Sequence, residues 1–541
     1  MSVENLGIFK SRTRFEIAPL TILTGPNSSG KSTVLNTLKL LRDSADLPHP
    51  DLTEHGRLFM SQLRFGRGRH GFTDFHDTLN RSSDDGTIRV SIGMKDVTLR
   101  WQTLPGWMAG DGDRYGLFGD KTERNISKEL EVDLEYDSAG LRRVRLNALQ
   151  NDGRLCTFAD FAFENSTTAH GGSAAIRGKI DYSILLAVVE SSIRSVAASR
   201  VPLYSKTDES PEKVEESLNV GFESNYNRQS SGVGLEGLYS DIMWNLPIKY
   251  KCRDILNCYF LKPVMKSIVE SLYKTLSGLH VVPHRVDIQD NYFSVSSRTD
   301  IEGYESSFDF YIHDMRAYMN ELSRQHDIVY NHMSNIDRLC QEYGISNRLQ
   351  INVVNQPDGR SAAGLTVSLN TESGVIPLHR LGRGHLRLLL MSIAIIGPQS
   401  AGLRRKRSLM VEEPEANLHP RLQSRLADFF VRGLPSFSDA GNEQKFFALN
   451  TDPRPFTRAR PLIVETHSPY FIKRLQILVG KGRVRGTDIA LHYLTGNHQS
   501  GETHYMIELD DNGKLSRPFG PGFTDELTGL ALQFAESDRK N

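Results

Sequence analysis

The segment FEIAPLTILTGPNSSGKST (residues 15–33) contains the pattern that predicts the fold. Gly25-Pro-Asn-Ser-Ser-Gly-Lys-Ser32 satisfies G-x-x-x-x-G-K-[ST] and directly follows a run of apolar residues. In this setting the glycines let backbone N–H groups surround phosphates, and the following helix adds the partial positive charge of its N-terminus. We therefore expect a strand over residues 15–24, a phosphate-binding loop, and a helix from Ser32 to about Leu41.

The residue types of this loop indicate individual roles. Lys31 is expected to hold the β- and γ-phosphates of a nucleotide, and Ser32 to ligate Mg²⁺. Further phosphate contacts are assigned to Asn27, Ser28, Gly30 and Thr33. The competing interpretation is an ordinary glycine-rich turn. A chance match in a chain of this length occurs about once in fifty sequences, and the flanking strand and helix favour the nucleotide site.

A second motif, SLMVEEP (residues 408–414), is an apolar strand that ends in two carboxylates. We assign Glu412 to Mg²⁺, held through water, and Glu413 to the general base that polarises an attacking water. An acidic pair at the end of a strand is often only a solvated turn. Here Glu415 and the run Asn417-Leu-His-Pro420 follow, and this pattern is too specific for a solvated turn.

A third motif, LIVETHS (residues 462–468), is another apolar strand with a histidine at its end. A lone histidine in such a place is more often structural. His467, however, follows the acidic strand by one helix and one strand. This order favours a histidine that contacts the γ-phosphate and responds to its loss.

Together the three motifs resemble those of ATP-binding-cassette (ABC) ATPases, specifically the soluble branch related to structural-maintenance (SMC), Rad-fifty and OLD-type heads. The resemblance implies ATP and Mg²⁺ as cofactors. It also implies an α/β fold, an ABC-ATPase head with a mixed sheet plus a parallel P-loop core and a helical insertion between Walker A and Walker B. The head is then assembled from both ends of the chain, since Lys31 and Glu412 are far apart in sequence.

The hydrophobic pattern divides the chain into three parts. Period-two alternation predicts antiparallel strands over 87–95, 97–101, 129–136 and 141–149, and apolar residues at three- and four-residue spacing predict helices over 180–199, 256–279 and 314–344. Strands return at 349–354, 364–370, 408–414, 462–467 and 489–496, with helices at 385–397 and 420–433 and a hairpin with a D-N-G turn at 503–516. We assign residues 1–175 to the N-terminal part of the head, 176–347 to a helical insertion for partner binding or dimerisation, and 348–541 to the C-terminal part.

Composition restricts the class of protein. The 541 residues carry a formal net charge of zero, which argues against a protein that coats nucleic acid through its overall charge. The four cysteines, Cys156, Cys252, Cys258 and Cys340, are too few and too irregularly spaced for zinc or a disulfide framework. The N-terminus lacks the apolar run of a signal peptide, and the longest apolar stretches are too short to cross a bilayer. We expect a cytoplasmic protein without a membrane segment.

A narrower resemblance rests on four short stretches, namely residues 63–75, 280–293, 378–390 and 521–526. These look like degenerate versions of stretches in the PtuA-type ATPases of Septu and retron anti-phage systems. The ABC resemblance implies a homodimer or higher even oligomer formed through the ATP heads, and the narrower resemblance implies a role in anti-phage defence. It also implies an HNH nuclease partner of the PtuB type, with a reverse transcriptase and its RNA–DNA product as possible further partners.

The chain departs from the ABC pattern at the signature. The candidate is Leu381-Gly382-Arg383-Gly384-His385-Leu386-Arg387, in which Gly382 and Gly384 are retained but the serine is absent. Helix-terminal N–H groups there are expected to face a nucleotide on a second copy, with charge from Arg383 or Arg387. Slow or conditional hydrolysis is the expected consequence. Gln62 is the candidate Q-loop glutamine, although an ordinary surface glutamine fits equally well.

Other functions stay open from sequence alone. Basic clusters at residues 64–69, 404–407 and 454–460 allow nucleic-acid contact if the fold brings them together, but each fits a solvated face better. A DNA-repair or structural-maintenance-like clamp is the main alternative, weakened by the absence of heptads. An OLD-type nuclease is less favoured, because 74 residues after His467 leave little room for its metal-binding domain. Nuclease activity is therefore not expected in this chain.

Overall fold

The structure is a computed structural model of the chain. It describes residues 1–45, 60, 62–65, 71–95, 97–100, 123–126, 129–150, 153–166, 173–190, 219–227, 261–282, 292–294, 337–338, 340–345, 348–355, 362–372, 374–396, 408–432, 434, 436–437, 461–496, 502–520 and 523. The chain divides into two compact units. The first is built from residues 1–14 and 36–277, and the second from residues 15–35 and 278–541. All three sequence motifs belong to the second unit.

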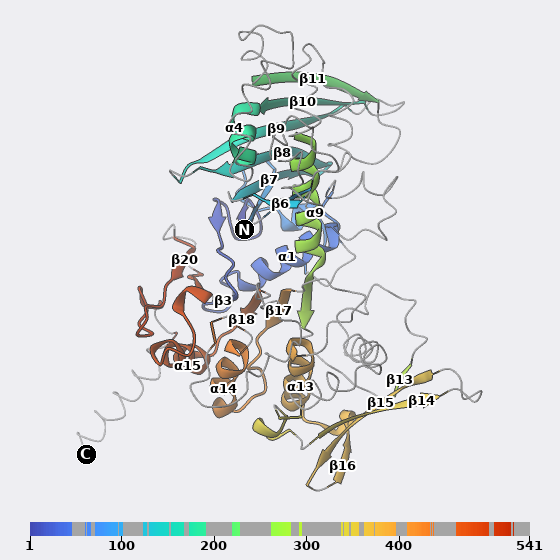
Figure 1. The fold of residues 1–541 in the computed structure, drawn as a ribbon, viewed down its shortest axis with the longest axis vertical. Coiled ribbons are helices and arrows are strands. Elements are labelled where there is room, and N and C mark those ends of the chain that lie inside the picture. The colour runs from blue at the N-terminus through green and yellow to red at the C-terminus, as the bar shows by residue number, and fades with distance from the viewer. Residues whose placement is uncertain are drawn as a thin grey trace, which may run out of the picture. The chain divides into compact units, whose positions relative to one another are not determined.

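The first unit contains an antiparallel sheet of eight strands in the order β11-β10-β9-β8-β7-β4-β1-β2 (Figure 1). The strands are β1 (Ser2–Glu4), β2 (Thr13–Arg14), β4 (Ile88–Met94), β7 (Leu130–Asp137), β8 (Gly140–Leu149), β9 (Leu155–Ser166), β10 (Ser173–Asp181) and β11 (Asn219–Asn227). The predicted strands at 87–95, 129–136 and 141–149 are confirmed. A separate pair, β5 (Thr98–Arg100) with β6 (Glu123–Asn125), confirms the strand predicted at 97–101.

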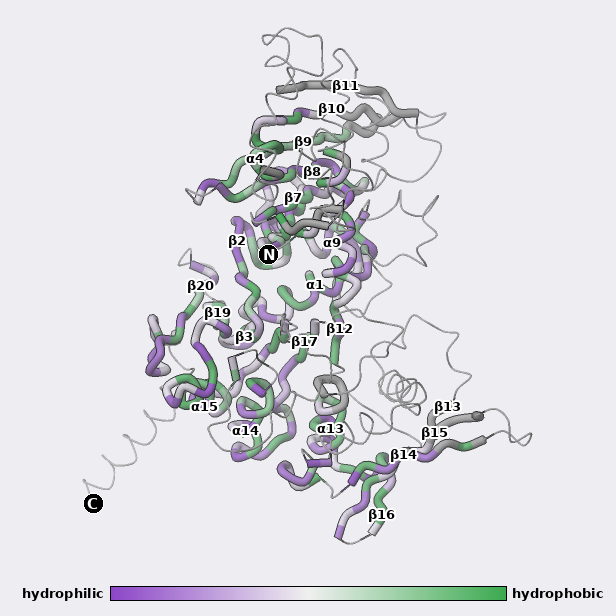
Figure 2. The backbone as a smooth tube through the Cα atoms, in the orientation of Figure 1, coloured by the Kyte–Doolittle hydropathy of each residue, from purple (hydrophilic) through white to green (hydrophobic). Residues whose placement is uncertain are grey.

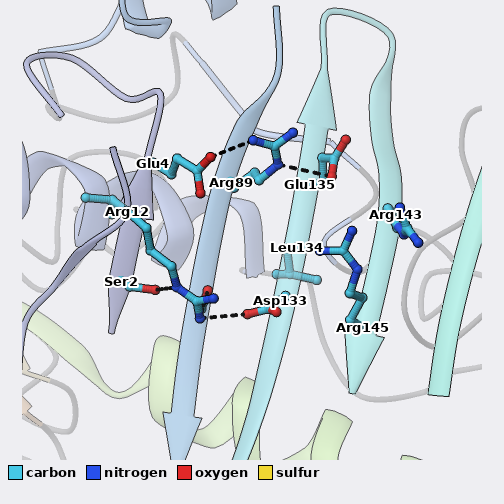
Figure 3. Close-up of a pocket in the computed structure, with 11 residues that line it drawn as sticks. Ser2, Glu4, Arg12, Arg89, Asp133, Leu134, Glu135, Arg143 and Arg145 are labelled. Atoms are coloured by element: carbon cyan, nitrogen blue, oxygen red, sulfur yellow. Dashed lines mark hydrogen bonds and ion pairs between the residues drawn. The ribbon is translucent and has the colours of Figure 1, made fainter. Parts of the chain in front are cut away.

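Side chains alternate between the two faces of a strand, and β7 shows this alternation clearly. In β7 every second residue is buried, and Figure 2 shows apolar and hydrophilic residues alternating there. Arg89 pairs with Glu4 at 2.6 Å and with Glu135 at 3.2 Å. Figure 3 shows these ion pairs lining a small pocket, together with the contact from Arg12 to Asp133.

The second unit is built on a six-stranded sheet in the order β12-β17-β18-β3-β19-β20, parallel except for β20. The strands are β3 (Leu20–Thr24), β12 (Leu279–Val282), β17 (Ser408–Glu412), β18 (Leu462–Glu465), β19 (Ile489–Leu494) and β20 (His504–Ile507). All five residues of β3 are buried, as expected for a central parallel strand with both faces covered. The parallel P-loop core is therefore confirmed.

Helices complete this unit; those at 31–45, 383–396 and 420–431 lie where the sequence predicts helices, whereas the helix at 469–480 was not predicted. They are α1 (Lys31–Ala45), which begins in this unit, α13 (Arg383–Ile396), α14 (Pro420–Val431) and α15 (Pro469–Gly480). Helices α14 and α15 pack through the rings of Phe430 and Phe471, whose centroids lie 5.8 Å apart, and through the ion pair of Asp428 with Arg474 at 2.7 Å. A small antiparallel sheet follows the order β13-β15-β14, with β16 paired to β15. Its strands are β13 (Tyr292–Ser294), β14 (Arg348–Asn355), β15 (Ala362–Thr371) and β16 (Gly374–Pro377).

The segment between the two Walker motifs is more varied than the helical insertion expected from sequence. Helices α4 (Tyr182–Glu190) and α9 (Lys262–Ser277) fall within predicted helices, but β11, β12 and β13 are strands. The expected boundary at 175/176 lies inside β10. Strand β12 escapes the hydrophobic pattern because it has only four residues, whereas β11 was missed although Val220, Phe222 and Tyr226 alternate with polar residues. Most of the helix predicted at 314–344 lies outside the described residues.

The predicted turn at D-N-G is present. The Asp510 carbonyl oxygen accepts the Gly513 N–H at 2.8 Å, and Gly513 has φ +76°. In the part of the chain that the structure describes, no helix has the length and apolar character needed to cross a bilayer.

A pair of histidines is enclosed where β19 meets β20. His492 Nδ1 lies 2.8 Å from His504 Nε2, and His492 Nε2 lies 2.8 Å from the Glu16 carbonyl oxygen. The ring of Phe15 packs on both imidazoles. Burial, with a smaller effect of His492, lowers the pKa of His504 to about 3, and burial also lowers the pKa of His492. Both rings are therefore neutral at pH 7.

This pair predicts that the fold loses stability in mild acid. As pH falls below the ordinary histidine pKa, the unfolded chain binds a proton that folded His504 does not, so the free energy of unfolding decreases from about pH 6.5 toward pH 3. Replacing His504→Gln keeps a hydrogen-bond donor and removes this titration. Between pH 7 and pH 5 the variant is expected to lose about 1–2 kcal/mol less stability than the unaltered chain, measured by urea unfolding. The exposed His379→Gln should follow the unaltered chain, and an unchanged pH response of His504→Gln would contradict the expectation.

Candidate nucleotide-binding and catalytic site

Strand register brings the three motifs to one edge of the six-stranded sheet. Strand β18 lies between β17 and β3, and all three are parallel (Figure 1). Glu465 is paired with Glu412 on one side and with Leu23 on the other. Because parallel strands present their carboxyl ends at the same edge, the phosphate-binding loop, the acidic pair and His467 all follow strand ends at this edge.

The phosphate-binding loop has a backbone that requires its glycines. Gly25 has φ +143°, and a Cβ there would lie 2.2 Å from the Leu494 carbonyl oxygen at the end of β19. Gly30 has φ +95° and Ser28 has φ +61°, both outside the range that side chains ordinarily favour. Asn27 and Ser28 are exposed, and Thr33 is half-buried in the first turn of α1. That turn has no acidic residue, so nothing on it opposes an anion.

The Lys31 ammonium is directed into the loop. It donates to the Pro26 carbonyl oxygen at 2.6 Å and to the Gly25 carbonyl oxygen at 3.2 Å. Burial lowers the pKa of Lys31, and Glu465 and Glu413 oppose this effect. The ammonium is thus held at the centre of the loop, next to the carboxylates, where phosphate oxygens would compete with the carbonyls for its protons.

Ser32 is tied to the strand that ends in the histidine motif. Its hydroxyl donates to Glu465 Oε1 at 2.8 Å. Glu465 is 3% exposed. Burial raises its pKa, and the hydrogen bond from Ser32 opposes that shift. Sequence reasoning assigned no role to Glu465, although its position as a carboxylate at the end of an apolar strand resembles that of Glu412.

The acidic strand end is shaped by an unusual backbone angle. Glu413 has φ +40°, a conformation that is costly for a residue with a side chain. The Glu413 N–H donates to the Glu465 carbonyl oxygen at 2.7 Å, which fixes this turn against β18. Residues held in such conformations are concentrated at functional sites, so the angle supports a role for Glu413.

Glu415 and His467 form a second connection between the motifs. The Glu415 carboxylate accepts the backbone N–H of His467 at 2.6 Å. Burial raises the pKa of Glu415. Burial and then the Lys31 charge lower the pKa of His467, while Glu413 opposes the shift, so the imidazole is neutral at pH 7. In the sequence, Glu415 stands out only as part of the pattern that follows the acidic strand. Its contact with His467 is formed by the fold.

The signature segment contacts the acidic strand of its own chain. Arg387 on α13 is buried and donates to the Glu412 carbonyl oxygen. Burial lowers the pKa of this guanidinium, and Glu415 opposes the shift. Of the two arginines considered as the source of charge for a second copy, Arg387 is engaged within its own chain and Arg383 is exposed. A Cβ at Gly384 would lie 2.6 Å from the Asn417 carbonyl oxygen, so this glycine is needed for packing whatever else it contacts.

The other predicted residues fall in different surroundings. Gly382 and Arg383 are exposed at the start of α13. Gln62 belongs to the first unit, where its exposed side chain donates to the Ala139 carbonyl oxygen at 3.5 Å. Its Q-loop role stays a prediction. The basic clusters at 404–407 and 454–460, and residues 66–69 of the first cluster, lie outside the described residues.

The residues present fit a nucleotide with Mg²⁺. The loop has the glycine geometry of a phosphate cradle, an inward ammonium and a helix N-terminus, and Ser32 Oγ retains lone pairs for a cation. Within the described ranges, no three His, Cys, Asp or Glu side chains are placed to hold a metal ion by themselves. This agrees with how Mg²⁺ is bound in such sites, through few protein ligands together with water and substrate phosphates.

A family model described as "AAA domain, putative AbiEii toxin, Type IV TA system" matches residues 20–96 and 297–473. The two matched segments contain the phosphate-binding loop, the acidic strand and the histidine strand. These two segments are therefore similar to an AAA domain. The match has two parts, which are separated by residues 97–296.

Solved structures give only a weak likeness to this chain. The Smc head domain of Pyrococcus furiosus bound to the C-terminal domain of ScpA is 10% identical, with 99% of this chain and 98% of that chain covered and a TM-score of 0.34. The SMC head domain of Thermotoga maritima is 8% identical, with 94% and 97% covered and a TM-score of 0.31. No curated protein matches the chain. The ATPase assignment therefore rests on the family match and the arrangement of the motifs.

Lys31 provides a direct test of nucleotide binding. Replacing Lys31→Ala removes the ammonium from the loop and is expected to weaken ATP binding at least about 10-fold, since a charge-assisted contact to phosphate contributes roughly 1.5–3 kcal/mol. The measurement is titration with a fluorescent ATP analogue. The matched control is Lys473→Ala, an exposed lysine on α15 that should bind ATP normally. Equal affinities of the two variants would contradict the assignment of the loop.

Proposed function

We propose that this ATPase hydrolyses ATP between two copies of the chain and uses the cycle to control a partner effector. The observation that supports this most strongly is the register of β17, β18 and β3. It gathers Lys31, Glu413 and His467 at one sheet edge although Glu413 and His467 follow Lys31 by more than 380 residues in sequence.

Each of these residues has a chemical role in the proposal. Lys31 would bind the β- and γ-phosphate oxygens, and Ser32 and Glu412 would hold Mg²⁺, whose charge would favour transfer of the γ-phosphoryl group. The Glu413 carboxylate accepts a proton from the water that attacks phosphorus. His467, neutral at pH 7, donates a ring N–H toward the γ-phosphate and loses that contact when phosphate leaves.

Dimerisation through the ATP sites follows from the exposed start of α13. Gly382 and Arg383 are exposed, whereas Arg387 in the same helix is buried against Glu412. We propose that the helix terminus faces the nucleotide of a second copy, in the manner of an ABC signature. Since the signature serine is absent, hydrolysis is slow or conditional on the partner.

The finer part of the proposal concerns the biological setting. We propose an HNH nuclease of the PtuB type as the controlled effector in anti-phage defence, with a reverse transcriptase and its RNA–DNA product in the retron form, and residues 176–347 as the docking or dimerisation region. Its support is the resemblance of the short stretches to PtuA-type ATPases. The family description, which names a putative toxin of a toxin–antitoxin system, agrees with an ATPase coupled to a harmful activity. A DNA-repair or structural-maintenance-like clamp is the alternative.

Replacement of Glu413→Gln tests the proposed cycle. The amide keeps the shape of the side chain but cannot accept the proton, so hydrolysis is expected to fall at least about 100-fold, while ATP binding persists. The variant should form an ATP-dependent dimer that dissociates slowly, measured by light scattering after size-exclusion chromatography.

The control is the exposed Glu372→Gln, which should hydrolyse ATP and dimerise like the unaltered chain. A Glu413→Gln variant that hydrolyses ATP normally would exclude the general-base role. Co-purification with products of neighbouring genes, followed by nuclease assays with and without ATP, tests the partner. Nuclease activity that does not change with ATP or with Glu413→Gln would count against an ATP-controlled effector.

A further inference from the structure

Glu465 is a buried carboxylate in the nucleotide site that none of the sequence motifs explains. We propose that Glu465 is a positioning residue for Ser32, whose hydroxyl hydrogen it accepts so that the lone pairs of Ser32 Oγ are directed toward Mg²⁺. The inference rests on the proposed function, because it assumes that Ser32 is a magnesium ligand.

The hydrogen bond between Ser32 and Glu465 has a fixed geometry, because Glu465 is held by the strands on either side of β18. Ser32 Oγ and Glu465 Oε1 are 2.8 Å apart, and they come from residues separated by 433 positions in sequence. The backbone of Glu465 is held by its pairing with Leu23 and Glu412 in the neighbouring strands. Its carbonyl oxygen also accepts the Glu413 N–H at 2.7 Å. The carboxylate is therefore placed by three backbone segments of the site and not by a mobile loop.

The hydrogen bond to Glu465 determines where the hydrogen and the lone pairs of Ser32 Oγ point. A serine hydroxyl has one hydrogen and two lone pairs, and a rotating hydroxyl can turn its hydrogen toward a cation. Donation to Glu465 commits the hydrogen to one direction and leaves the lone pairs available. A carboxylate acceptor also makes the oxygen a stronger electron donor, as outer-shell carboxylates do for the histidine ligands of metals.

The charges around Glu465 agree with a nearby cation. The Glu465 side chain is 3% exposed. Glu412 is its paired neighbour in β17, and Glu413 is bonded to its carbonyl oxygen. A divalent cation beside Ser32 offsets the repulsion among these carboxylates. A role limited to holding α1 against β18 predicts a different result, namely lower stability without any change in the response to magnesium.

The experiment compares ATP binding as a function of Mg²⁺ concentration in the full chain. Replacing Glu465→Ala is expected to raise the Mg²⁺ concentration for half-maximal ATP binding at least about 10-fold, with ATP affinity in EDTA nearly unchanged. Glu465→Gln retains an acceptor oxygen without the charge and should give a smaller rise, about 3-fold. The exposed Glu508→Ala is the matched control and should respond like the unaltered chain.

A double-mutant cycle shows whether Glu465 acts through Ser32. If it does, Ser32→Ala combined with Glu465→Ala should need no more than about twice the Mg²⁺ of Ser32→Ala alone. Additive effects would overturn the positioning role, and so would an unchanged magnesium response in Glu465→Ala and Glu465→Gln. If the unaltered chain binds ATP without any magnesium dependence, both the proposed metal site and this inference fail. A normal response of the unaltered chain with unchanged Glu465 variants overturns the inference alone.

Discussion

The site depends on the parallel pairing of β17, β18 and β3. Parallel strands place their carboxyl ends together, and a shift of register by one residue would turn every side chain to the opposite face of the sheet. Glu412 and Glu465 are paired across this register, and the Glu413 N–H and the Thr466 N–H are bonded to the next strand along. The apolar residues before these ends are buried, so the same hydrophobic packing that folds the sheet also sets the positions of the polar groups.

Burial shifts the pKa values of the charged side chains at this edge of the sheet. Lys31, Arg387, Glu415 and Glu465 are each no more than 8% exposed, although charged side chains are seldom enclosed unless they are paired. Burial is the largest influence on the pKa of each of them. The opposite charges of the group reduce the cost of this enclosure and keep the side chains oriented before any ligand binds, which is the condition for effective electrostatic catalysis.

Sequence alone predicted the core of this unit because its strands are short, apolar and end in recognisable residues. Lys31, Glu413 and His467 belong to such motifs, and the structure brings them to one edge. No role was predicted for Glu465, because its hydrogen-bond partner, the Ser32 hydroxyl, is 433 residues away in sequence. The choice between Arg383 and Arg387 stayed open because sequence does not show which way a helix faces. Strands β9 and β10 were not predicted, since charged and small residues interrupt their alternation.

The Leu494 carbonyl lies against Gly25, so the phosphate-binding loop is complete only after Leu494 has been synthesised. This wall of the phosphate loop belongs to β19, which the ribosome makes about 465 residues after the loop itself, a delay of roughly 25–90 s at ordinary rates of elongation. The other partner of β3 is β18, which is made only shortly before β19, so β3 has no partner in its sheet until residues 462–465 have emerged. The nascent chain therefore cannot assemble its nucleotide site early, and a chain interrupted before β19 has a Walker sequence without a Walker site.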